Sequence, residues 1–134
     1  MKRMLIVATL ALSAGIAGCA PPALTKDQMA AMDYGAPMTQ DQATSVAVAW
    51  MNNYLKDPYS AHYTWQPAYK GVVTTSIMEG SQRLPGYILN GTVNAKNSYG
   101  GYTGAQDYQF LIKDGQVVYV SKRDPETGVM MRAQ

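Results

Sequence analysis

The spacing of apolar residues changes at Pro58, and this change constrains the fold more than any other feature of the sequence. Before Pro58, apolar residues recur at the spacing i, i+3, i+4, i+7, i+8 and i+11 of a helix. Thr39 and Gln42 match a capping box at the start of this segment. Pro58 forbids continuation of the helix and biases Asp57 away from a helical conformation. We predict one amphipathic helix over residues 40–56, with this stripe facing the core: Ala43, Val46, Ala47, Trp50, Met51 and Tyr54.

Beyond Pro58, apolar and polar residues alternate with the period of a half-buried strand. The alternation runs from Ala61 to Trp65, and residues 69–75 extend that strand or form a second one. Residues 76–84 are polar and are predicted as a loop. The clearest strand covers residues 87–96, and Gly91 inside it indicates a bulge or a close approach of the helix. Its apolar face carries Tyr87, Leu89, Gly91, Val93 and Ala95.

Asp114 and Gly115 separate the last two strand-like segments and suit a two-residue type I′ hairpin turn. That turn pairs Lys113 with Gln116 and Ile112 with Val117. Extended without a bulge, the same register pairs Phe110 with Tyr119 and places both on one face with Ile112 and Val117. The chain from Arg123 onward is polar and is predicted to fray.

Together these elements predict an α+β fold in one domain, with one N-terminal amphipathic helix packed on a small antiparallel sheet of three to five strands. The domain is expected over residues 39–123. Residues 124–134 are expected to form a polar C-terminal tail, and residues 19–38 a flexible tether. The tether could reach at most ~60 Å when extended, or roughly 25 Å as a coil. Thr25 and Gln28 form a second capping box inside the tether, which allows a short helical turn there.

The first residues have the three parts of a secretory signal peptide. Lys2 and Arg3 are positive, Met4 to Ile16 is mainly apolar, and small residues follow. This apolar run is too short to span a bilayer, which takes about 20 residues. The alternatives are an ordinary secretory peptide with an unrelated cysteine, or a buried core helix.

The segment Ile16-Ala17-Gly18-Cys19 resembles the lipobox of bacterial lipoproteins. The resemblance implies that residues 1–18 are a signal peptide, that diacylglycerol is attached to the Cys19 thiol, and that cleavage precedes it. It also implies a third acyl chain on the new amino group, and several chains anchor a protein stably. Ala20 stands where an Asp would retain such a protein at the inner membrane. We therefore expect the periplasmic side of the outer membrane rather than the inner membrane.

The charge and the reactive residues of the mature chain argue against several function classes. Without Lys2 and Arg3, nine of the eleven basic residues remain against nine acidic ones, so no electrostatic reason favours nucleic acid. The single histidine, His62, and the single cysteine give no set of ligands for zinc. We interpret His62 as solvated or paired across strands, and Glu79 with Asp107 is the only acid pair worth naming. The sequence predicts no catalytic residue, metal or cofactor.

Residues 94–104 are rich in glycine and tyrosine, between two predicted strands. No Gly-Lys-Ser/Thr and no helix follow, so a phosphate-binding loop is not indicated. One interpretation is a long hairpin connection in which glycines supply positive φ. The other is a binding loop, because tyrosine, serine, glycine and asparagine are typical of adaptable recognition surfaces. Its predicted contacts are Asn97, Ser98, Tyr99 and Tyr102.

The same stretch carries a second resemblance. Residues 55–61 read Leu-Lys-Asp-Pro-Tyr-Ser-Ala, and residues 93–104 read Val-Asn-Ala-Lys-Asn-Ser-Tyr-Gly-Gly-Tyr-Thr-Gly. These are similar to segments shared by a group of small, uncharacterised bacterial envelope and secreted proteins. Some members carry a cysteine shortly before the second segment, whereas residues 89–92 here contain none. We attach no biochemical function to that group.

From these observations we expect a lipid-anchored, non-catalytic envelope lipoprotein, acting as a binding or structural module. Its expected partners are the membrane, through the acyl chains on Cys19, and an envelope protein or cell-wall component. One alternative is a lysozyme-type inhibitor, because residues 98–102 loosely resemble the Ser-Gly-x-x-Tyr loop of such inhibitors. A peptidoglycan-acting enzyme is the other alternative.

Overall fold

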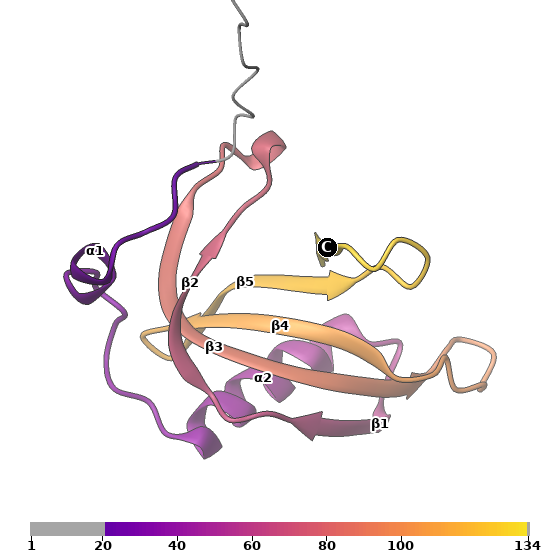
Figure 1. Cartoon of the computed structure of the whole chain (residues 1–134). Helices are drawn as coiled ribbons and strands as arrows, with labels where there is room; N and C mark the ends of the chain where they lie inside the picture. The colour runs from indigo at the N-terminus through magenta and orange to yellow at the C-terminus, as the bar shows by residue number, and fades with distance from the viewer. Residues whose placement is uncertain (1–20, 134) are drawn as a thin grey trace, which may run out of the picture.

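The computed structural model describes residues 21–133, so the predicted signal peptide and Cys19 lie outside the described residues. The described chain is an α+β structure in which a helix lies across a mainly antiparallel sheet (Figure 1). This confirms the predicted fold class. The sheet has six strands in the described part of the chain, more than predicted. The elements are α1 (Lys26–Ala30), α2 (Gln40–Tyr54), β1 (Asp57–Trp65), β2 (Tyr69–Thr74), the 3-10 turn η1 (Ile77–Glu79), β3 (Arg83–Lys96), β4 (Gln106–Lys113), β5 (Gln116–Arg123) and β6 (Met130–Arg132).

The long strand β3 is the centre of the sheet. The strand order is β1-β3-β4-β5-β6, and β2 also pairs with β3. β2 pairs with residues 83–88 of β3, whereas β1 pairs with residues 91–96. Pro67 lies between β1 and β2, where its missing N–H interrupts the pairing. The two predicted strands on either side of Pro67 therefore lie along one edge of β3.

Helix α2 confirms the predicted stripe and its capping box. The Thr39 hydroxyl accepts a hydrogen bond from the Gln42 N–H, and the Gln42 side-chain oxygen accepts one from the Thr39 N–H. Ala43, Ala47 and Met51 are fully buried. The helix ends at Tyr54, two residues before the predicted end, because Leu55 is extended and packs against the core. Helix α1 precedes it, so α2 is not the first helix of the described chain.

The main core lies between α2 and the sheet and is rich in aromatic side chains. Trp50 stacks on Tyr54 with ring centroids 4.7 Å apart, and Trp50 and Trp65 each meet Phe110 edge-on at 5.8 Å. Such edge-on pairs add stability beyond the area that they bury. The fully or nearly buried members of this core are Ala43, Ala47, Met51, Leu89, Val93, Tyr108, Phe110, Ile112 and Val120.

Gly91 is required by a neighbouring side chain rather than by the helix. A Cβ atom at Gly91 would lie 2.3 Å from Cε3 of Trp65 and 2.8 Å from the carbonyl oxygen of Thr64. No register shift occurs at Gly91 in either of its pairings. The predicted bulge or helix approach is therefore wrong, and the close neighbour is the indole ring of Trp65 on β1.

The β4–β5 hairpin confirms the predicted turn but corrects its register. Asp114 and Gly115 both have positive φ, of 51° and 74°, as a type I′ turn requires. Lys113 pairs with Gln116 and Ile112 with Val117, as predicted, but Val118 has no partner and forms a bulge. Phe110 therefore pairs with Val120, and the predicted pair with Tyr119 is wrong.

The bulge has a consequence for both faces of the sheet, because one extra residue moves the following side chains to the other face. Val120 joins the core beneath α2. Tyr119 instead joins a second, smaller cluster with Val73, Ile88 and Leu111. The bulge therefore lets the neighbouring residues Tyr119 and Val120 enter different cores.

The segment predicted as a flexible tether lies against the domain. The Asp33 carboxylate is 3.0 Å from the Lys113 ammonium group. The Ala36 N–H donates to the Asp114 carboxylate at 2.8 Å, and the Arg83 guanidinium donates to the Pro22 carbonyl oxygen. The second capping box is also formed, between Thr25 and Gln28 of α1. This segment is ordered because polar residues at the β4–β5 turn supply hydrogen-bonding partners for its backbone.

The predicted polar tail also carries regular structure. Strand β6 pairs with the end of β5, and the Ala133 N–H donates to the Val120 carbonyl at 2.9 Å. The turn before β6 is closed by Asp124, whose carboxylate accepts from the N–H of Thr127 at 2.7 Å. The prediction of fraying is therefore wrong for residues 130–132. Over residues 21–133, no helix is long and apolar enough to cross a membrane.

Candidate recognition site

The loop between β3 and β4 is fastened by the side chain of Asn97. Its Oδ1 accepts hydrogen bonds from the N–H groups of Tyr99 and Gly101, at 2.9 and 3.1 Å. The Asn97 N–H donates to the Gly101 carbonyl at 2.8 Å. Gly100, with φ of 80°, occupies a conformation that side chains rarely adopt. Asn97, predicted as a ligand contact, therefore acts within the loop and fixes its shape.

Tyr99 projects from this fastened loop. Its side chain is 96% exposed, and Ser98 beside it is also exposed. The return half of the loop is attached to β3, because Lys96 forms a bridge with Tyr102 and the Thr103 N–H donates to the Ala95 carbonyl at 3.2 Å. Two of the predicted contacts, Ser98 and Tyr99, are thus presented to solvent on an ordered backbone.

Tyr102 is held by neighbours that the sequence did not connect to it. Its hydroxyl is 3.1 Å from Nε2 of His62 on β1. The Lys96 ammonium lies 5.5 Å from the centroid of the Tyr102 ring, within the range of a cation–π contact. His62, interpreted as solvated or paired across strands, contacts this loop tyrosine and stands opposite Asn94 of β3. Lys96 was missed, although its position on the polar side of the predicted strand 87–96 placed it on this face.

Residues 55–61 and 93–104 meet at this site. The Lys96 N–H donates to the Ser60 hydroxyl at 2.8 Å, and that hydroxyl donates to the Asp57 carbonyl at 2.8 Å. The register of β1 on β3 is irregular between Asp57 and His62. Within this irregular stretch Tyr59 is 100% exposed. The site therefore combines the start of β1, the end of β3 and the loop that follows.

One polar atom next to this site has no partner. Asn94 lies directly opposite His62 in the β1–β3 pairing, and its Oδ1 is buried without a hydrogen bond among the described residues. Buried acceptors are normally satisfied, by water where no protein donor reaches them. Asn94 therefore leaves an unpaired acceptor beneath the surface, opposite His62 in the β1–β3 pairing.

The acidic residues considered as an enzymatic pair are engaged with arginines. Glu79 lies 3.2 Å from Arg132, and Asp107 lies 3.0 Å from Arg123. Hydrogen bonds to Glu79, first from the Ser76 hydroxyl, lower the pKa of its carboxyl group. A general acid needs a raised pKa, so Glu79 is poorly suited to that role. The described residues contain no group of three or more side chains that could hold a metal ion.

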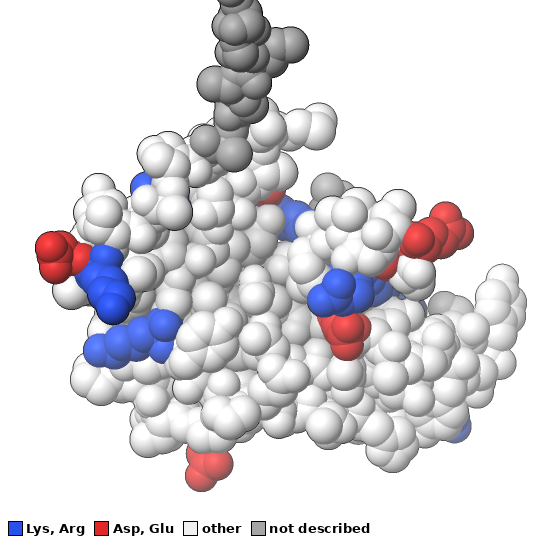
Figure 2. Space-filling view, in the orientation of Figure 1, with Lys and Arg blue, Asp and Glu red and all other residues white. Residues whose placement is uncertain are grey.

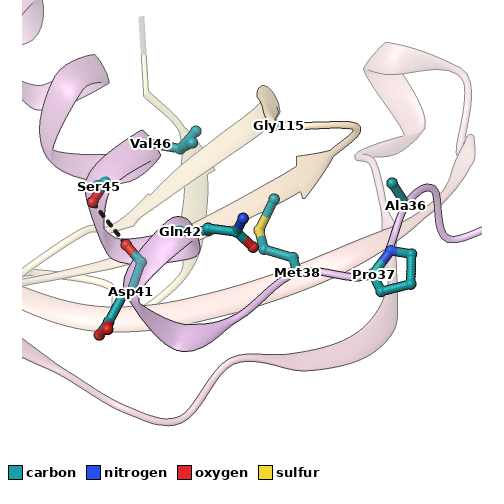
Figure 3. Close-up of a pocket in the computed structure, with 8 residues that line it drawn as sticks. All are labelled: Ala36, Pro37, Met38, Asp41, Gln42, Ser45, Val46 and Gly115. Carbon is teal, nitrogen blue, oxygen red and sulfur yellow. Dashed lines mark hydrogen bonds between the residues drawn. The ribbon is translucent and has the colours of Figure 1, made fainter.

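A hollow of about 480 Å³ lies elsewhere, between the start of α2 and the β4–β5 turn (Figure 3). Among its lining residues the Met38 and Gln42 side chains lie next to each other in Figure 3, and the Asp41 carboxylate points away from them. The Ser45 hydroxyl donates to the Asp41 carbonyl at 2.7 Å. Ligand sites combine an apolar lining with converging polar groups, and such convergence is missing here. The lining residues are Ala36, Pro37, Met38, Asp41, Gln42, Ser45, Val46 and Gly115.

The charged side chains on one face of the molecule give no preference for a partner of one sign. On the face shown in Figure 2, blue and red side chains are scattered and no extended block of one sign forms. The loop with Tyr99 is therefore the most distinctive candidate site of the described chain. Comparison with protein-family models, curated proteins and solved structures finds no match to this chain.

Proposed function

We propose that this chain is a lipid-anchored, non-catalytic envelope lipoprotein whose β3–β4 loop binds another envelope component. The observation that carries the proposal is the fully exposed Tyr99 on a loop whose backbone Asn97 fixes. The partner is a protein or a cell-wall component on the periplasmic side of the outer membrane. The lipobox resemblance at Ile16-Ala17-Gly18-Cys19 supports the lipid attachment.

The arrangement favours binding because the loop is ordered before it meets a partner. Binding normally costs the entropy of ordering loops and side chains. Here four hydrogen bonds to Asn97 atoms already hold the backbone from Tyr99 to Gly101. Tyrosine adds contact area with only two χ angles to fix. Tyr99 therefore supplies an apolar ring and a hydroxyl at a small entropic cost.

Tyr102 and its neighbours complete the binding surface. The contacts from His62 and Lys96 leave Tyr102 49% exposed, in a defined orientation. The Lys96 ammonium adds a donor beside the Tyr102 ring. A partner that offers an apolar face with adjacent hydrogen-bonding groups would fit this combination.

The test is crosslinking mass spectrometry in the native host, comparing the wild type with a Tyr99→Ala/Tyr102→Ala variant. One partner should appear with the wild type and be lost with the double variant. Tyr69→Ala is the control, because Tyr69 is an exposed tyrosine (48%) on β2, outside the site. Crosslinks that are diffuse and unchanged in the double variant would show that the loop is only a hairpin connection.

A further inference from the structure

Two large apolar side chains stand in solvent at the connection between β2 and β3. Ile77 is 77% exposed and Met78 is 99% exposed. Both belong to η1, which caps the hairpin at the end where the described chain begins (Figure 1). We call the Ile77–Met78 pair the apolar tip. Single exposed apolar residues are ordinary, but two consecutive ones at the end of a projecting hairpin form a small apolar surface.

Hydrogen bonds beneath the apolar tip fix the conformation of its turn. Glu79 accepts from the Ser76 hydroxyl at 2.9 Å and from the Ser76 N–H at 3.2 Å. The other Glu79 oxygen meets Arg132, which balances its charge. The Thr75 N–H donates to the Gln82 carbonyl at 2.9 Å and extends the hairpin to the tip. Ile77 and Met78 are therefore displayed on an ordered turn.

The start of the mature chain is fastened to the same hairpin. The Arg83 guanidinium donates to the Pro22 carbonyl, and Arg83 is the first residue of β3. Only three peptide steps separate Pro22 from Cys19. Three extended residues span at most ~11 Å. Lipid attached to Cys19 would therefore bring the bilayer surface to the hairpin that carries the apolar tip.

We infer that the apolar tip inserts into the lipid surface that holds the acyl chains of Cys19, and so fixes the orientation of the domain. This inference rests on the proposed lipid attachment. The occupant is lipid rather than a protein, because the short link from Cys19 leaves little room for another chain between tip and bilayer. The polar interface of a bilayer is roughly 6 Å deep on each side, which suits two side chains at the end of a turn.

The inferred orientation places the recognition loop away from the membrane. β3 begins at the hairpin with Arg83 and ends at Lys96, immediately before the loop. Its thirteen steps correspond to roughly 40 Å along the strand. Acyl chains on Cys19 and the apolar tip would hold one end of β3 at the lipid, and Tyr99 would face the periplasm from the other end.

The experiment uses the full lipoprotein purified from its host, with Met78→Cys as a single added cysteine. Cys19 is the only cysteine of the natural sequence, so a thiol-reactive fluorescent probe labels position 78 alone once Cys19 is acylated. The matched control is Tyr59→Cys, a 100% exposed position near the far end of β3. Both proteins are reconstituted into phosphatidylethanolamine–phosphatidylglycerol vesicles, with and without brominated phospholipid.

At position 78 we expect a blue-shifted probe emission and a several-fold greater quenching by brominated lipid than at position 59. Equal emission and no quenching at both positions would overturn the inference. Protection of position 78 in native envelopes but not in vesicles would also overturn it, in favour of a protein occupant. The intact mass separates the two proposals, because an unacylated Cys19 would refute the lipid attachment itself. An acylated chain without quenching would refute only the insertion of the tip.

Discussion

Replacing Gly91 with alanine tests whether the Trp65 ring decides which residue stands at the centre of β3. In a strand interior, alanine is normally more stable than glycine by about 0.5–1 kcal/mol, because glycine loses more backbone entropy on folding. The added methyl group would lie 2.3 Å from Cε3 of Trp65 and 2.8 Å from the Thr64 carbonyl oxygen. Side chains can rotate away from such contacts, but a backbone oxygen held in the sheet cannot.

Strand propensity alone predicts that Gly91→Ala stabilises the protein, whereas these contacts predict that it destabilises the protein. Forcing extra atoms into a packed site costs about 1–3 kcal/mol. After the entropy gain, Gly91→Ala should lower the free energy of unfolding by about 1–2 kcal/mol. For a domain of this size, that corresponds to a melting temperature roughly 5–15 °C lower.

The assay is urea unfolding followed by tryptophan fluorescence, since Trp50 and Trp65 both lie in the core that unfolds. Gly101→Ala is the control, because a Cβ there would meet nothing nearer than 3.8 Å and its φ is not positive. It should change stability by less than about 0.5 kcal/mol. Gly91→Ala with stability equal to or above the wild type would refute the packing argument.

Two further predictions concern the order of the β3–β4 loop and the dependence of stability on pH in acid. Asn97→Ala should abolish the hydrogen-exchange protection of the Tyr99 and Gly101 amides. The melting temperature should stay within a few degrees of the wild type, because the lost hydrogen bonds are confined to the exposed loop. Unchanged protection would show that the backbone alone shapes the loop. Hydrogen bonds to Glu79, chiefly from Ser76, lower the pKa of that carboxyl group in the folded state. Its contribution to stability is therefore complete above the ordinary carboxyl pKa of 4.5 and is lost as the pH falls through the lowered value. In Glu79→Gln, the urea midpoint of unfolding should fall less steeply than in the wild type as the pH is lowered below that value. An equally steep fall in both proteins would contradict the role given to Glu79.

The positions of the site and of the apolar tip together imply an orientation of the proposed module relative to the membrane. One end of β3 lies beside Pro22, and the other end leads into the loop that Asn97 fastens. Because Pro22, Asp33 and Ala36 are bonded to the domain, a lipid on Cys19, as proposed, would be separated from it only by the few residues before Pro22. The site at Tyr99 would then be presented at a fixed height above the membrane.

Local signals in the sequence determined the elements whose interactions are short-range. The capping box at Thr39 and the apolar stripe of α2 involve residues within a few turns of one another. The Asp114-Gly115 turn needs positive φ at two adjacent residues, which that dipeptide tolerates. The alternation in β3 likewise follows from the period of an isolated strand. The exposed tyrosine loop was visible for the same reason, as a run of turn residues between strands.

Only the tertiary structure decided the features that depend on contacts between distant residues. The bulge at Val118 depends on which side chains fit two cores at once, and the two-residue turn does not reveal it. The contact of Trp65 with Gly91 and the contact of Ser60 with Lys96 require that β1 pairs with β3. Periodicity identifies a strand but not its neighbour, because the backbone hydrogen bonds of a sheet are alike along every strand. The choice of neighbour is made by packing over the whole domain, which is why the partners of Tyr102 and the course of residues 21–38 appeared only in the folded chain.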